Sequence, residues 1–421
     1  MTKRLRVLAA FVSVIITALY LSVWVELASR GSFKPVDFWV FYSEAVLVWE
    51  GHGNQLYDLG IQNQYQFQLL GSFPLNGRVL PFIGPPHLAL ALLPLAILTP
   101  HWAFSFWIAL QIVLVVLLIR LYIAESSEFS WPERIISIGA LVSFPILFVT
   151  IYKGQLSLII LLCIILWIRE MRKGNDQGIA VWLLIGSIKP QLIVVPFLLT
   201  ILARRWKALA YFAAGGTLIT TICAISLGPV SIRDFVLSIM RIDSNFLVTP
   251  LLVYMYNFKG FLTLILGLGS LPLIRSLTFA GFICALIIVI LLWRGRVYID
   301  DERFDLKMAL SLLLGIFFCP YLFYYDTLLL VVVAKLFHDY LMQSGIKTAR
   351  WLFIAIIFLI PPFFLESSFI AVAGYMVRWS AILMMLWMLL ILITFINNKK
   401  YNGKASASLP PLESTDEVAG F

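Results

Sequence analysis

The feature that most constrains this chain is a long succession of apolar runs separated by short basic clusters. The first run extends from Val7 to about Leu27, long enough to cross a hydrocarbon core of about 30 Å. Further runs follow at about 84–99, 101–123, 135–152, 156–168, 178–203, 208–228, 260–272, 274–293, 307–319, 321–337, 351–365 and 375–396. The pattern predicts an all-α polytopic membrane protein with roughly eleven to thirteen membrane-embedded helices.

Composition excludes the main soluble classes. Hydrophobic residues make up 61% of the 421 residues and charged residues only 13%, whereas a soluble domain carries about 25% charge. A water-soluble fold could not cover so much apolar surface with polar groups. The net charge of +9 falls mostly in the clusters between runs, so it does not indicate a nucleic-acid partner. Membrane lipids are the expected surroundings.

The basic clusters predict the orientation of the helices, because Lys and Arg concentrate in cytoplasmic loops. Lys3, Arg4 and Arg6 precede the first run, which we interpret as a retained helix because no small-residue cleavage site clearly follows it. The other clusters expected in the cytoplasm are Arg169, Arg172 and Lys173; Arg204, Arg205 and Lys207; Arg294 and Arg296; Lys335 and Lys347; and Lys399 and Lys400. The sequence thus predicts a multi-pass inner-membrane protein with both termini cytoplasmic.

The predicted organisation is one transmembrane domain, 1–396, followed by a disordered cytoplasmic tail, 397–421. Within the domain, 28–83 carries three basic and four acidic side chains, a net charge of −1, and is expected to be a large external loop. Its segment 38–50 has apolar positions at helical spacing, which predicts an amphipathic helix lying on the outer membrane face. Glu44 and Glu50 are expected on the solvated side of that helix.

Two runs do not fit simple crossings. The 178–203 run has basic clusters on both sides but is too short for two spans, and Pro190 at its middle removes a helical hydrogen bond. It therefore predicts a broken or re-entrant pair whose polar elbow, Lys189-Pro190-Gln191, faces protein or a water-filled cavity. One half of 84–123 is likewise not expected to span fully.

Ionisable residues at membrane depth are costly, and several gather on the predicted outer face. They are Asp37, Lys189, Asp326, Asp243 and His87, and the polar Gln155 after Gly154 is expected on the same face. Their convergence would suit transfer of a sugar from a lipid-linked phosphate, in which a carboxylate takes the acceptor proton and cations or amides hold the departing phosphate. Asp37 is the natural base, and Lys189, Lys153, Arg78 and Arg378 are candidate phosphate partners.

Structural interpretations of the same residues stay open. Asp37 could cap a helix that starts at 38, and Asp326 could pair with a neighbouring helix or cap 327–337. His87 could be an ordinary interfacial histidine, and Lys189 could form a structural ion pair. The chain contains neither a GxGxxG nor a P-loop motif, so nucleotide-sugar chemistry of the Rossmann kind is unsupported.

Five segments in this order resemble glycosyltransferase family 87. These bacterial polytopic enzymes of the GT-C superfamily include polyprenyl-phosphate-mannose-dependent mannosyltransferases. The resemblance covers roughly 36–335. The segments are VDFWVFYSEAVLVWEGHGNQLYD, GPPHLALALLPLAIL, KGQLSLIILL, GSIKPQLIVVPFLLTILARRWKAL and CPYLFYYDTLLL.

The resemblance implies a GT-C fold, a polyprenyl-phosphate-linked donor, inversion at the anomeric carbon and a catalytic base at Asp37. The glycine-glutamine, lysine-proline and tyrosine-aspartate elements of the family correspond to Gly154-Gln155, Lys189-Pro190-Gln191 and Tyr325-Asp326. Some relatives carry a phosphate-binding histidine just before the last pair, where this chain has Tyr321-Leu322-Phe323-Tyr324. No DxD motif lies beside Asp37, so neither a bound metal nor another cofactor is indicated.

We therefore predict a hexosyltransferase, with mannose as the first candidate sugar. It would act from a polyprenyl-phosphate-linked donor onto a lipid or glycan acceptor at the outer face of the inner membrane. Asp37 would be the base, Lys189, Gln155 and Arg78 would hold the phosphate, and Asp326 would orient a sugar or a cation. The predicted substrate-binding residues are Lys189, Gln155, Gln191, Asp326, Tyr325, Arg78, His87 and Glu44.

Two competing functions are a flippase for lipid-linked saccharides and a membrane glycan polymerase or ligase. Transporters often repeat a broken helix in two matching halves, whereas this chain shows one clear break and no obvious repeat. Polymerases and ligases commonly place their large external loop late in the chain, whereas here it follows the first helix. Both observations favour the transferase.

Overall fold

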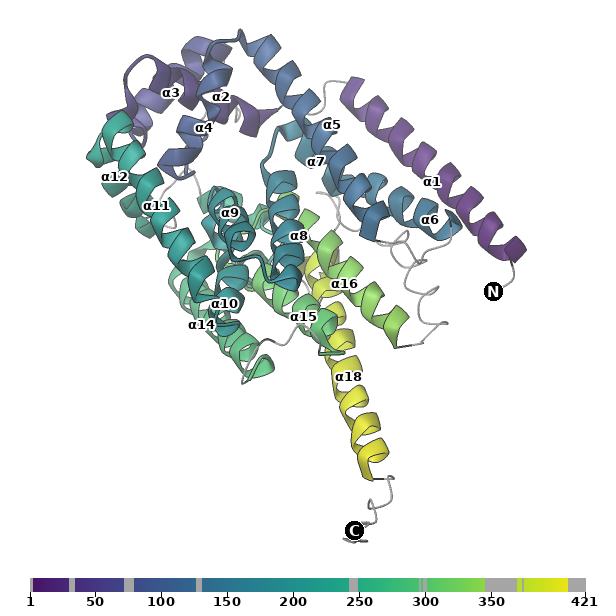
Figure 1. Ribbon diagram of the computed structural model, residues 1–421. Coiled ribbons are helices and arrows are strands. Elements are labelled where there is room, and N and C mark those ends of the chain that lie inside the picture. Colours follow the sequence, from purple (N-terminus) through teal and green to yellow (C-terminus); the bar gives the residue numbers. More distant parts are fainter. Residues whose placement is uncertain are drawn as a thin grey trace, which may run out of the picture.

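A computed structural model describes residues 3–29, 35–71, 79–125, 131–241, 249–294, 297, 301–344, 369–372 and 375–407. These residues are predominantly helical, as predicted (Figure 1). The α-helices in the first half of the chain are α1 (Lys3–Ser29), α2 (Val36–Trp49), α3 (Leu59–Leu70), α4 (Pro86–Ala96), α5 (Pro100–Glu125), α6 (Trp131–Val142), α7 (Pro145–Lys153), α8 (Ser157–Lys173), α9 (Asp176–Gly186) and α10 (Val194–Leu202).

The described part of the second half contains further helices and a small hairpin. Its α-helices are α11 (Trp206–Leu227), α12 (Pro229–Arg241), α13 (Phe258–Leu266), α14 (Leu271–Leu292), α15 (Phe304–Phe317), α16 (Leu330–Gln343) and α18 (Trp379–Ala407). Short 3-10 helices are η1 (Gly53–Gln55), η2 (Pro190–Leu192), η4 (Thr249–Tyr254), η5 (Leu268–Ser270) and η6 (Tyr324–Leu329). Strands β1 (Phe369–Val372) and β2 (Tyr375–Arg378) pair antiparallel.

Within the described residues, five helices are long and apolar enough to cross a bilayer. They cover Val7–Glu26, Pro100–Ala124, Trp206–Leu227, Leu268–Leu292 and Trp379–Ile396. A sixth span is possible if α6 and α7 count as one, although they bend by 47° at their junction. In the described part of the chain, the predicted eleven to thirteen membrane-embedded helices thus correspond to five or six full-length spans and a set of shorter helices. Among the latter, α4 has only 11 residues, which confirms that one half of 84–123 does not span. The run 351–365 lies outside the described residues.

The 178–203 run is broken at Pro190, as predicted, into two short helices. Helix α9 rises to the elbow at η2, and α10 returns to the end from which α9 started. Arg205, which follows α10, connects this end of the pair to the start of α9. Its guanidinium donates to the backbone oxygens of Gly174 and Met171 and lies 3.6 Å from the Asp176 carboxylate. The two helices have 11 and 9 residues, so neither reaches across about 30 Å of hydrocarbon. At the elbow, Lys189 faces protein, since its side chain is paired with Asp326 and only 11% of it is exposed.

Helices α2, α3 and α4 form a layer at one end of the bundle, at the upper edge of Figure 1. Two fully buried glutamines on α3, one turn apart, fix the chain that leads into α4. Gln62 Oε1 accepts from the Phe82 amide at 3.0 Å, and the Gln66 side chain exchanges two hydrogen bonds with the Leu80 backbone. This end of the molecule is consequently a fixed layer and not a loose loop.

The environment of α2 differs from the prediction. A helix forms at nearly the expected residues, but its side chains from Val40 through Leu47 are buried, and Glu44 has no exposed surface. Helices α3 and α4 cover it, so it does not present an amphipathic face to solvent or lipid. The placement of Glu44 on a solvated side is therefore wrong, although Glu50 is exposed as predicted.

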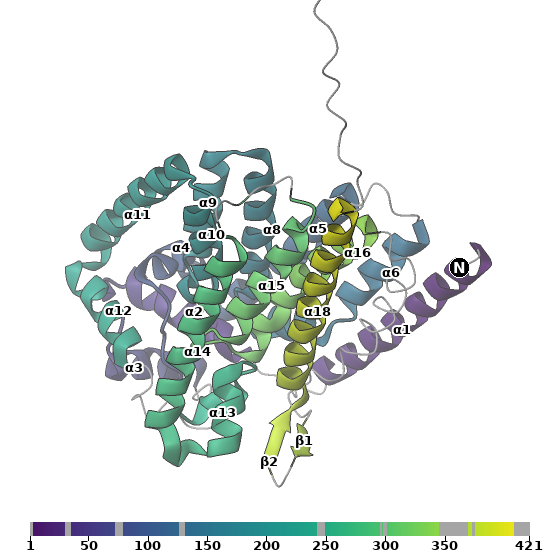
Figure 2. The same ribbon diagram turned by 90° about the horizontal axis from the view of Figure 1, so that it is seen from below.

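The main core lies under this layer. It joins α8, α9, α10, α15, α16 and α18, whereas α1 packs on α6 at one side of the molecule (Figures 1 and 2). Helix α18 begins beside β2 and projects away from the layer. It remains helical through Ala407, so it includes the first part of the segment predicted as a disordered tail from Asn397.

Candidate active site

Four segments that are far apart in the sequence meet beneath the α2–α4 layer. They are the first turn of α2, the turn between α7 and α8, the elbow η2 and the short helix η6. Each is the end of a helix or a break between helices, so each brings polar side chains to the same end of the bundle. Together they unite Asp37, Gln155, Lys189, Tyr325 and Asp326.

Lys189 is the centre of this cluster. Its ammonium donates to Asp326 Oδ1 at 2.6 Å, to Gln155 Oε1 at 3.1 Å and to Ser157 Oγ at 3.2 Å. Ser157 donates to the same Asp326 oxygen at 2.6 Å. The ion pair is well shielded, since 11% of the Lys189 side chain and 3% of the Asp326 side chain are exposed. The structural ion pair considered for Lys189 and Asp326 is therefore present.

Gly154 brings the α7–α8 turn against the start of α2. Its φ of +74° lies in the left-handed region, and a Cβ on it would come within 2.5 Å of the Phe38 Cβ. Glycine permits both the backbone conformation and the contact. The neighbours of Gly154, Lys153 and Gln155, consequently flank Asp37, which precedes Phe38.

Asp37 lies inside the helix and does not cap it. The N-cap position of α2 belongs to Pro35, and Asp37 is in the first helical turn, so the capping alternative considered for Asp37 does not hold. Burial raises the pKa of the Asp37 carboxyl above its ordinary value, while the Lys153 ammonium and a hydrogen bond with Gln155 act in the opposite direction. A carboxylate with a raised pKa is a stronger proton acceptor than an exposed one.

Tyrosine rings line the other side of the cluster. The Lys189 ammonium lies 4.8 Å from the Tyr325 ring centroid, and the Lys153 ammonium lies 5.3 Å from that of Tyr324. Burial raises the pKa of the Tyr325 hydroxyl, and the Asp37 and Asp326 carboxylates raise it further. Tyr325 therefore stays a neutral hydroxyl close to both acids.

The sequence model of one glycosyltransferase family, family 87, matches residues 82–323. This match covers more than half of the chain and includes the α7–α8 turn and the elbow. The chain belongs to glycosyltransferase family 87. No curated protein and no solved structure matches it.

Family membership makes this chain a membrane glycosyltransferase, and the matched segment contains only part of the cluster. Lys153, Gln155 and Lys189 lie within it, whereas Asp37 precedes it and Asp326 follows it by three residues. The family match therefore does not extend to these two acids.

The other predicted site residues are distributed differently. His87 lies at the start of α4, where its Nε2 is 3.2 Å from Ser187 Oγ near the elbow, as an ordinary partnered histidine would be. Glu44 is buried beside α3 and α4, and neither of its oxygens has a hydrogen-bond partner in the described part of the chain. Arg78 and Asp243 lie outside the described residues.

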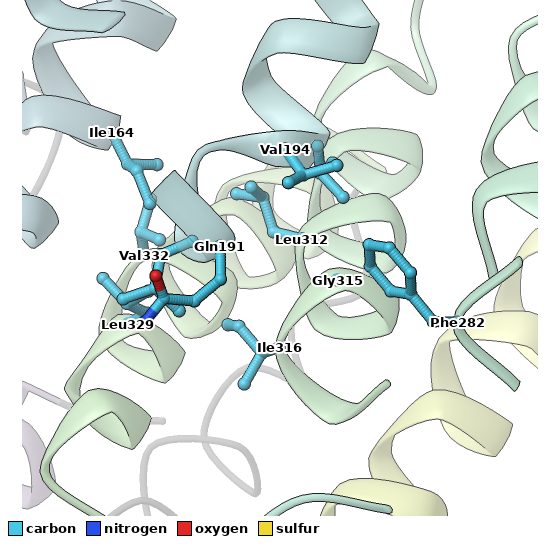
Figure 3. A pocket seen from close by; sticks show the side chains of 11 residues that line it. Ile164, Gln191, Val194, Phe282, Leu312, Gly315, Ile316, Leu329 and Val332 are labelled. Atoms are coloured by element: carbon cyan, nitrogen blue, oxygen red, sulfur yellow. The ribbon is translucent and has the colours of Figure 1, made fainter. Parts of the chain in front are cut away.

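Gln191 lines a separate pocket. This small recess lies between α8, α10, α14, α15 and α16, and the rest of its lining is apolar (Figure 3). Arg378 is also placed apart from Asp37, since its guanidinium donates to the Val253 backbone oxygen and the Tyr256 hydroxyl. The ring of Tyr256 lies 5.8 Å from that of Tyr324, so Arg378 borders the cluster from beyond this pair.

Sequence reasoning missed Ser157 as a member of the site. Ser157 belongs to the KGQLS segment, two residues after Gln155, but its contact with Asp326 depends on how η6 packs on α8.

In the described residues, no group of three or more His, Cys, Asp or Glu side chains is arranged to hold a metal ion.

Proposed function

We propose that this family 87 glycosyltransferase transfers a hexose, with mannose as the first candidate, from a polyprenyl-phosphate-linked donor to a hydroxyl of a lipid or glycan acceptor. Asp37 carries the proposal. Its carboxylate is flanked by the Lys153 ammonium and the Gln155 amide at the end of the helical bundle, and the residue keeps some exposed surface. A base beside hydrogen-bond donors for an anion is what this reaction requires.

In the proposed reaction, the Asp37 carboxylate takes the proton of the acceptor hydroxyl while the hydroxyl oxygen attacks the anomeric carbon. The bond between that carbon and the phosphate oxygen breaks on the opposite side, which inverts the configuration. The phosphate leaves with the bonding electron pair and gains one negative charge. Donors already fixed near this position stabilise that charge without reorganising during the reaction.

The direction of the helices supports a site on the outer face. Helices α8 and α18 begin at the site end of the bundle and end at basic residues, with Lys173 at the end of α8 and Lys399 and Lys400 within α18. α8 has 17 residues and is therefore about 25 Å long. Because basic ends face the cytoplasm, we place the site outside, both termini inside and the protein in the inner membrane.

An apolar lipid is a suitable carrier for the donor. The site borders a membrane-embedded bundle, and the apolar recess behind the elbow is reached within two residues of Lys189. A phosphate held at the site would lie beside the membrane-embedded helices, so that its lipid chain could remain in the bilayer. We therefore propose a lipid-linked donor and not a water-soluble nucleotide sugar.

The test is sugar transfer in proteoliposomes. Radiolabelled polyprenyl-phosphate sugars are supplied with membrane lipid extract as acceptor, and wild type is compared with Asp37→Asn and with Lys207→Met, an exposed cation remote from the site. Removing a general base lowers the rate by about 10²–10⁴-fold. We expect that loss in Asp37→Asn and normal transfer in Lys207→Met.

Equal transfer by wild type and Asp37→Asn would refute the assignment of the base and direct attention to Asp326 and Asp243. Absence of transfer from every donor, together with movement of lipid-linked sugar across the vesicle membrane, would instead support a flippase.

A further inference from the structure

The hydrogen bonds of Lys189 leave it little capacity for substrate. A lysine ammonium has three N–H donors, and three oxygens of Asp326, Gln155 and Ser157 lie within 3.2 Å of this one. The Asp326 carboxylate also neutralises its charge. To bind a phosphate, Lys189 would have to break a shielded ion pair and leave a buried carboxylate unpaired, which is strongly unfavourable.

Lys153 differs from Lys189 in the contacts of its ammonium. It is half-buried at the last residue of α7, and in the described part of the chain its ammonium makes neither a hydrogen bond nor an ion pair. Its neighbours are the Tyr324 ring and, through charge, Asp37. Arg378, by contrast, already donates to protein oxygens. Among the described residues around the base, Lys153 is therefore a partly exposed cation with its donors unused.

We propose that Lys153 is the residue that binds the donor phosphate, and that Lys189 and Asp326 are positioning residues that hold Gln155. This inference rests on the proposed function, because it assumes a phosphate-linked donor. It also revises the sequence-based assignment, in which Lys189 held the phosphate.

The position of Lys153 fits both stages of the reaction. A carboxylate and a phosphate close together repel each other, and a cation between Asp37 and the phosphate offsets that repulsion in the bound state. When the bond from the anomeric carbon to the phosphate oxygen breaks, the bonding pair stays on the phosphate, and the Lys153 ammonium is in place for the added charge. The proton goes from the acceptor hydroxyl to Asp37, so Lys153 remains an ammonium throughout.

Gln155 explains why the buried ion pair is needed. Its side-chain oxygen accepts from Lys189, and its amide nitrogen remains as the group that can donate to Asp37. The Gln155 backbone oxygen accepts from the Gln111 side chain at 2.9 Å. The pair thus fixes the orientation of one amide beside the base.

The experiment measures binding of farnesyl phosphate and of farnesol to the purified full-length protein in detergent, since the two probes differ only by the phosphate. Wild type should bind the phosphate more tightly than the alcohol. Lys153→Met should reduce that preference by about tenfold to a hundredfold, because a hydrogen bond to a charged group contributes about 1.5–3 kcal/mol. Lys153→Arg should retain most of it, and Lys207→Met all of it.

The double variant Lys189→Met/Asp326→Asn removes both charges of the buried pair and so avoids leaving one unpaired. It should keep the phosphate preference, while its transfer rate falls at saturating donor with little change in KM for the donor. A preference lost in the double variant but kept in Lys153→Met would overturn the proposal and assign the phosphate to Lys189.

Two further outcomes separate this proposal from the function on which it rests. If wild type bound farnesyl phosphate and farnesol equally, the phosphate-linked donor class would be wrong, and the role of Lys153 would fall with it. If wild type discriminated but Lys153→Met discriminated equally well, only the assignment of Lys153 would be wrong.

Discussion

Gly154→Ala tests whether the α7–α8 turn positions the base. Two costs can be worked from the structure. An L-residue at the φ of +74° costs about 1–2 kcal/mol. The new Cβ would also lie 2.5 Å from the Phe38 Cβ and 3.2 Å from its Cα, and overpacking of this kind costs about 1–3 kcal/mol. We expect a total destabilisation of about 2–5 kcal/mol.

Gly71→Ala is the matched control. Gly71 has a φ of +63°, but a Cβ there would have no heavy atom within 4 Å. It should therefore cost only about 1–2 kcal/mol for the backbone conformation. The difference between the two variants isolates the contact with Phe38.

Both variants are compared with wild type by unfolding in detergent, followed through tryptophan fluorescence, and by sugar transfer. Relief of the overlap at Phe38 moves the adjacent Asp37, and a misplacement of about 1 Å can lower a rate by about a hundredfold. Gly154→Ala should thus be less stable than Gly71→Ala and nearly inactive, whereas Gly71→Ala should transfer normally. Equal stability and equal transfer in the two variants would refute the argument that Gly154 sets the position of the base.

Three further predictions follow from the charges. Transfer should decline as pH falls through the raised pKa of Asp37. Lys153→Met should move this acidic limb of kcat/KM to higher pH, because it removes a charge that lowers the pKa of Asp37. An unmoved limb would exclude coupling between Lys153 and Asp37. Burial raises the pKa of Glu44 well above its ordinary value, so its contribution to stability is present at low pH and is lost as pH rises through the folded-state pKa. Glu44→Gln should accordingly flatten the fall in melting temperature with rising pH and stabilise the protein by about 1 kcal/mol at about pH 8. An unchanged dependence of melting temperature on pH would contradict this role of Glu44. The orientation can be tested in chains whose exposed native cysteine is replaced. In intact cells, an impermeant maleimide should label Gln64→Cys, on the exposed side of α3, and should not label Lys207→Cys. The reverse pattern would place the site inside.

The sequence was most informative where a local rule acts alone. Pro190 cannot continue a helix, and charged ends cannot enter the bilayer, so the re-entrant pair and its elbow at Lys189 could be predicted without any knowledge of packing. The short α4 followed in the same way from the count of crossings. The segments around Gln155 and Asp326 were also located correctly as members of one cluster.

What the sequence did not reveal depends on which surfaces meet. In a membrane protein, apolar side chains face both lipid and protein, so periodicity could not show that α2 is covered on its other sides by α3 and α4. The same ambiguity misplaced Glu44. Nor can a sequence show which of two lysines has its donors occupied, because Lys189 acquires its three acceptors only when η2, η6 and α8 pack together.

The helix ends at the cluster determine how much of the phosphate preference should remain after Lys153 is replaced. Helices α2 and α8 begin at Val36 and Ser157, so the positive ends of two helix dipoles lie at the cluster. Helix α7 ends at Lys153, whose ammonium lies at the negative end of that helix. A phosphate bound beside Lys153 would therefore also experience the field of backbone groups that no side-chain substitution removes. For this reason we expect Lys153→Met to weaken the phosphate preference and not to abolish it, and the remaining preference should decrease as salt screens the partly exposed site.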